Sequence, residues 1–79
     1  MRDTQPPITN EQQLIGYTAG LARLNEVVSI REQALFASQD DPERLEHARQ
    51  ELYRIYRKRQ GILDAIAVYE RHKAAQQSA

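Results

Sequence analysis

The stretch S-Q-D-D-P-E, residues 38–43, decides the fold that we expect for this chain. Asp41 is a residue type that caps helices, because its carboxylate accepts hydrogen bonds from the free backbone N–H groups of the next helix. Pro42 suits the first helical position, where no N–H bond is lost, and Glu43 meets the positive end of the helix dipole. The stretch therefore predicts a turn near residues 38–41, followed by a helix.

The residues before this turn have the pattern of one long helix. The helix starts at Thr9 or Asn10, because Gln12 stands three residues after Thr9, as in a capping box. Apolar side chains then recur every three or four residues, interrupted only by Arg31. They are Leu14, Tyr17, Leu21, Leu24, Val28 and Leu35. We expect this first helix at about 10–38.

The same spacing continues after the turn and is interrupted only by Arg59. The apolar residues there are Leu45, Ala48, Leu52, Ile55, Ile62, Ile66 and Tyr69. Two such helices joined by a short turn lie side by side and antiparallel. The sequence therefore predicts an all-α fold, an antiparallel two-helix hairpin (αα-hairpin), with its second helix at about 42–74. Its register pairs Leu35 with Leu45, Val28 with Leu52 and Leu14 with Ile66.

The chain divides into one structural unit and two short ends. We expect a flexible arm at residues 1–8, where Pro6 and Pro7 keep the chain extended. The hairpin occupies residues 9–75, and a frayed tail follows at residues 76–79.

A hairpin of this kind has one apolar seam, whereas this chain has apolar residues for more than one. The predicted core is Leu14, Leu21, Leu24, Val28, Leu35, Leu52, Ile55, Ile62 and Ile66. The predicted interface with a partner or a second copy is Ile15, Ile30, Phe36, Leu63, Val68 and Tyr69. We expect a homodimer with two-fold symmetry, which is the simplest way to bury this second set in a four-helix bundle; a different protein partner is the alternative.

The basic stretch YRIYRKRQ, residues 53–60, has two interpretations. The simpler one is a solvated helix face on which Tyr53, Arg54, Arg57 and Lys58 form a charged docking face for an acidic protein surface. The alternative is nucleic-acid binding, with the cations on phosphates and the tyrosines on exposed bases. The chain has 11 basic and 11 acidic residues, and this balance favours the protein partner. We expect Arg59, on the seam, to lie over the small Gly20.

No motif for catalysis, cofactor binding or metal binding is visible. The chain contains no cysteine, and Glu43, His47 and Glu51 follow one another at four-residue spacing without a second histidine. We therefore expect a protein that is not an enzyme and has no cofactor or metal. The sequence also has no membrane-spanning run and no secretory signal, so we expect it in the cytoplasm. The predicted role is a small interaction module of the adaptor, co-chaperone or inhibitor type.

Overall fold

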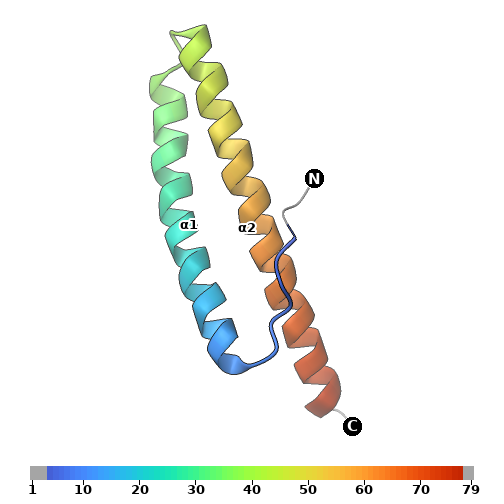
Figure 1. Ribbon diagram of the computed structural model, residues 1–79. Helices are drawn as coiled ribbons and strands as arrows, with labels where there is room; N and C mark the ends of the chain where they lie inside the picture. The colour runs from blue at the N-terminus through green and yellow to red at the C-terminus, as the bar shows by residue number, and fades with distance from the viewer. Residues whose placement is uncertain (1–3, 78–79) are drawn as a thin grey trace.

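The computed structural model describes residues 4–77, and it is an antiparallel hairpin of two helices (Figure 1). Helix α1 spans Glu11–Ala37 and helix α2 spans Pro42–Gln77. The prediction of an all-α hairpin is confirmed. The molecule is a rod with extents of 57 × 22 × 17 Å and a radius of gyration of 16.1 Å. A compact chain of this length has a radius of about 12 Å.

Helix α1 begins with a reciprocal pair of capping hydrogen bonds that resembles a capping box and is shifted by one residue from the predicted one. Asn10 is the N-cap, and its Oδ1 accepts a hydrogen bond from the Gln13 backbone N–H at 2.9 Å. Gln13 Oε1 in return accepts bonds from the backbone N–H and the hydroxyl of Thr9, at 2.7 and 2.9 Å. The pairing of Thr9 with Gln12 was wrong, because with Asn10 as the cap it is Gln13 that stands three residues on.

The turn forms as the sequence predicts. Asp41 Oδ1 accepts hydrogen bonds from the backbone N–H groups of Glu43 and Arg44, at 3.1 and 3.4 Å. The backbone N–H of Asp41 itself donates to the Ser38 carbonyl at 3.1 Å, which closes the turn. Helix α2 continues through Gln77, beyond the predicted end near residue 74. The last part of the predicted tail, residues 78–79, lies outside the described residues.

The core is a single seam between the two helices. Its buried members are Val28 on α1 and Leu52 and Ile62 on α2. The other predicted core residues are half-buried along the same seam: Leu14, Leu21, Leu24, Leu35, Ile55 and Ile66. No side chain of residues 4–77 is completely enclosed. One layer of two helices cannot surround a side chain on all sides.

Two polar contacts join the helices. The Tyr69 hydroxyl donates to Glu11 Oε1 at 3.2 Å, and the Tyr56 hydroxyl donates to Glu32 Oε2 at 3.2 Å. With Tyr69 opposite Glu11, Ile66 comes opposite Leu14, three residues further inward on each helix. At this end of the hairpin the pairing agrees with the apolar spacing. The same spacing puts Tyr56 opposite Leu24, and its hydroxyl instead reaches Glu32, eight residues further along α1.

The segment before α1 turns back and runs along α2 (Figure 1). Ile8 in this segment is buried, and the Tyr17 hydroxyl donates to the Pro6 carbonyl oxygen at 2.7 Å. We call residues 4–9 the arm. The sequence did not predict its contact with α2. Residues 1–3 lie outside the described residues, and flexibility of the segment stays a prediction.

The expected contact of Arg59 with Gly20 is wrong. A side chain added at Gly20 would have no atom of another segment within 4 Å. The Arg59 guanidinium instead lies over the ring of Tyr56, 5.0 Å from its centre. This cation–π contact joins neighbouring turns of the same helix, so Arg59 reaches it without crossing to α1.

Candidate interaction surfaces

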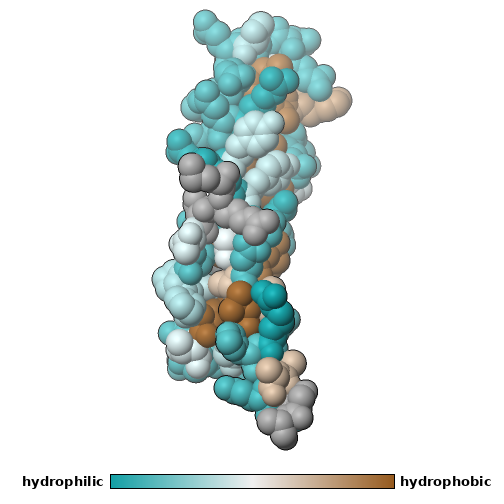
Figure 2. Space-filling model, turned by 90° about the vertical axis from the view of Figure 1, so that its right-hand side faces the viewer, coloured by the Kyte–Doolittle hydropathy of each residue, from teal (hydrophilic) through white to brown (hydrophobic). Residues whose placement is uncertain are grey.

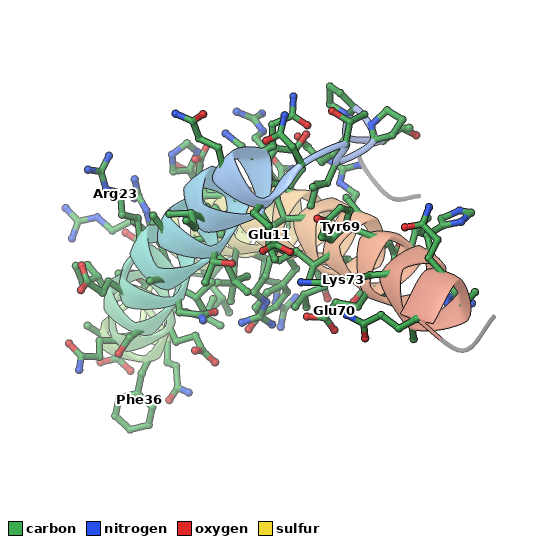
Figure 3. All side chains as sticks on the ribbon, turned by 90° about the horizontal axis from the view of Figure 1, so that it is seen from below. Glu11, Arg23, Phe36, Tyr69, Glu70 and Lys73 are labelled. Atoms are coloured by element: carbon green, nitrogen blue, oxygen red, sulfur yellow. The ribbon has the colours of Figure 1, made fainter. Side chains whose placement is uncertain are left out.

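The side of α1 turned away from α2 carries an exposed apolar strip. Ile15 is 69% exposed and Ile30 is 64% exposed. Exposed residues lie between them at intervals of four, three, four and four residues, which places them on one side of a helix. We call this surface the α1 outer face; its members are Ile15, Ala19, Ala22, Arg23, Glu26 and Ile30. Figure 3 shows Arg23 on the side of α1 opposite α2.

Phe36 is a separate apolar feature close to the turn. It is 74% exposed, and its ring points away from both helices (Figure 3). Phe36 lies six residues after Ile30, and this spacing turns the two side chains to different sides of α1. The predicted interface therefore does not continue from Ile30 to Phe36 as one strip.

Tyr69 belongs to the open end of the hairpin. Figure 3 shows it converging with Glu11 and Lys73, and both side chains hydrogen-bond Glu11 Oε1. The hydrogen bond from Lys73, followed by that from Tyr69, lowers the pKa of Glu11, and the same contact with Glu11 raises the pKa of Lys73. Desolvation, followed by the bond to Glu11, raises the pKa of Tyr69. The hydroxyl of Tyr69 thus already has a partner within the chain.

Val68 lies on a groove between the arm and α2. Gly61, Ala65 and Val68 form the α2 side of this groove, and Pro7 and Ile8 are on the arm side. Figure 2 shows hydrophobic side chains gathered in the lower half of one face of the molecule. The arm thus forms one wall of this groove, and Val68 on the other wall is still 42% exposed.

Leu63, which is 39% exposed, lies elsewhere on α2. A residue two positions from Gly61 and from Ala65 points to the opposite side of a helix. The six predicted interface residues are therefore spread over several surfaces. Only Ile15 and Ile30 share a strip that nothing within residues 4–77 covers.

The predicted charged face is exposed, and part of it is neutralised. Tyr53 is 62% exposed, and Arg57 and Lys58 are also exposed. Arg54 Nη1 lies 3.8 Å from Glu51 Oε1, an exposed ion pair of the kind that contributes little to stability. The structure thus leaves Tyr53, Arg57 and Lys58 directed at solvent.

Tyr56 and Arg59, from the same basic stretch, have structural roles. Tyr56 is half-buried, and its hydroxyl reaches Glu32 on α1. Desolvation, followed by the negative charge of Glu32, raises the pKa of Tyr56. Arg59 covers the ring of Tyr56. The stretch therefore contains two kinds of residue, one holding the hairpin and one facing water.

The sequence analysis missed Glu11, Glu32 and Lys73, which make the polar contacts between the helices. The apolar register was sufficient to find the first of these, because extending it outward from Leu14 and Ile66 places Glu11 opposite Tyr69. The contact of Lys73 depends on how far a long side chain bends, and the pattern of residue types carries no signal for that.

Within residues 4–77, no group of three or more histidine, aspartate or glutamate side chains is arranged to hold a metal ion. Neither described helix combines the length and apolar character needed to cross a bilayer. No protein-family model, no curated protein and no solved structure matches this chain.

Proposed function

We propose that this chain is a small protein-interaction module, not an enzyme, which acts by packing its helices against helices of another subunit. The observation that carries the proposal is the exposure of Ile15 and Ile30 on a helix that already buries its other side. A helix with apolar residues on two sides is typical of the interior of a bundle.

The surface area of the hairpin supports the same conclusion. Its accessible surface is 6243 Å², whereas a compact monomer of 9.1 kDa exposes about 4,900 Å². A chain that forms one thin layer has too little interior to bury its own apolar residues. Further helices, from a second copy or from another protein, would provide the missing layer.

Such a module would serve as an adaptor, a co-chaperone or an inhibitor, because each of these roles needs only a surface that binds and covers another surface. The absence of cysteine in the chain is consistent with the reducing cytoplasm as its compartment. The exposed Tyr53, Arg57 and Lys58 offer a second contact for an acidic protein surface.

Light scattering over a concentration series tests the proposal. We expect a molar mass above 9.1 kDa that rises with concentration, and no change when nucleic acid is added at low salt. A mass of 9.1 kDa at every concentration would exclude a second copy and leave a different protein as the partner. A mass increase only with nucleic acid would instead support the basic stretch as the functional surface.

A further inference from the structure

We propose that the partner of the α1 outer face is the same face of a second copy, packed antiparallel about a two-fold axis between residues 24 and 25. This inference rests on the proposed function and names its partner. It follows from the shape of the face, from its charges and from the area that the hairpin leaves uncovered.

The shape of the face suits close packing of two helices. Ile15 and Ile30 are large and lie at its ends, and Ala19 and Ala22 are small and lie between them. About this axis Ile30 of one copy meets Ala19 of the other, and Ile15 meets Ala34, an exposed residue one turn beyond Ile30. Each pair forms twice by symmetry. Large side chains then enter the space above small ones, as in the ridges and grooves of packed helices.

The charges of the face complement themselves in this arrangement. Arg23 and Glu26 are both exposed, and neither has an ion-pair partner within residues 4–77. The axis that brings Ala19 to Ile30 also brings Arg23 of each copy to Glu26 of the other. A parallel dimer would place Arg23 against Arg23, and such a pair of like charges is unfavourable. The two ion pairs therefore select the antiparallel orientation.

The other helix is a poorer candidate for the contact. Helix α2 has thirteen Asp, Glu, Lys and Arg residues among its 36, whereas α1 has five among its 27. Removing a charged surface from water costs free energy unless every charge finds a partner. On the α1 outer face only Arg23 and Glu26 are charged, and the two-fold axis pairs both.

The uncovered area is of the size that a dimer needs. The hairpin exposes about 1,300 Å² more than a compact monomer of its mass. A standard protein–protein interface removes about 800 Å² from each partner. One such interface on α1 would account for more than half of the excess surface.

A charge-swap experiment tests the proposal directly. Arg23→Glu gives a face with two acidic groups, and Glu26→Arg gives one with two basic groups. We expect each variant alone to dimerise at least tenfold more weakly than the wild type by light scattering. An equimolar mixture should form a one-to-one complex as tight as the wild-type dimer, because each Glu then meets an Arg of the other variant.

A second pair of variants controls for general loss of apolar surface. Ile30→Arg should abolish dimerisation with its helicity retained in circular dichroism. Leu63→Arg, the same change at an exposed apolar residue of α2, should leave the dimer intact.

The failure of this inference differs from the failure of the proposed function. If both charge variants associate as tightly as the wild type, the antiparallel contact on α1 is overturned, and the module itself stands. If Leu63→Arg disperses the dimer and Ile30→Arg does not, the interface lies on α2 instead. A wild type that stays monomeric at every concentration would overturn the second copy as the partner, and the proposed module would then bind a different protein.

Discussion

The two helices share one seam, and they differ on the sides turned away from it. Helix α1 carries exposed apolar residues there, with Ile15 and Ile30 the largest on its outer face. Helix α2 carries most of the charges of the chain, among them the exposed Arg57 and Lys58. The same hairpin thus has one helix whose outer side favours a covering partner and one whose outer side favours water. The two helices therefore both contribute to the seam but contribute differently to the outer surface of the hairpin.

Core substitutions should have the largest effect, and they test whether the two helices contribute equally to the seam. We expect Leu52→Ala on α2 to cost about 2–5 kcal/mol of unfolding free energy, because Leu52 is buried and its loss leaves a cavity. Leu24→Ala on α1 should cost less, since Leu24 is only half-buried. Urea denaturation followed by circular dichroism measures both. Equal costs would show that Leu24 is more enclosed in solution than in the isolated hairpin.

A glycine substitution tests whether the flexibility of glycine lowers the stability of α1. Gly20 lies within α1, where glycine is less favourable than alanine by about 1 kcal/mol. An added methyl group would meet no atom of another segment within 4 Å, so Gly20→Ala should stabilise the hairpin by about that amount. Thermal unfolding provides the measurement, and Gly16→Ala, equally open, is its matched control. A loss of stability in only the Gly20 variant would indicate that a partner helix approaches at that position.

A pH titration tests the polar contact that joins the open ends of α1 and α2. Because the pKa of Glu11 is lowered in the folded state, its contact with Lys73 favours folding above the ordinary carboxyl pKa. That contribution is lost as the pH falls through the lowered value. Glu11→Gln should therefore be slightly less stable than the wild type at neutral pH and equal to it in strong acid. Urea midpoints across the acid range give the comparison.

The contribution of Lys73 has the opposite dependence on pH. Its pKa is raised in the folded state, so its contribution is present below the ordinary lysine pKa and is lost as the pH rises through the raised value. A difference between the wild type and Glu11→Gln that stayed constant from neutral pH into strong acid would contradict the ion pair.

Charge reversal on α2 should have the smallest effect. Arg54, Arg57 and Lys58 are exposed, so changing all three to Glu should alter stability by about 0.5 kcal/mol or less per site. Dimerisation should persist, because these residues lie outside the α1 outer face. Light scattering and thermal unfolding check the two statements. Dissociation of the triple variant would contradict the contrast between the two helices, because the dimer interface would then lie on the charged side of α2.

Much of the fold could be predicted because it depends on local chemistry. Asp41 and Pro42 mark a turn wherever they stand before a helical pattern, and the apolar spacing sets the register. The cap of α1 was predicted as Thr9 or Asn10, and the structure has Asn10. The spacing could not choose between them because both are good caps, and the pairing with Gln12 was therefore wrong. The contact of Arg59 was misplaced because a long side chain reaches several partners, among which the ring of Tyr56 was closest along its own helix.

The candidate interface was only partly predictable. Spacing identified the apolar residues beyond the seam, and helical geometry was sufficient to turn Val68 and Leu63 to different sides of α2. It could not show that the arm lies beside Val68. The arm was missed for a related reason. Its contact through Ile8 joins segments far apart in the sequence, and no short-range pattern reports such a contact.

The sequence by itself determined two helices, the turn between them and the seam that pairs them, because capping and helical periodicity act over a few residues. Only the tertiary structure decided that the arm forms a groove with α2 beside Val68, that Tyr69 is held by Glu11 and that Ile15 and Ile30 stay in water. These outcomes depend on which surfaces meet in space. In a single layer of two helices each helix buries only the side that faces the other. The opposite side of α1 stays exposed, and this is the surface that we propose binds a second copy.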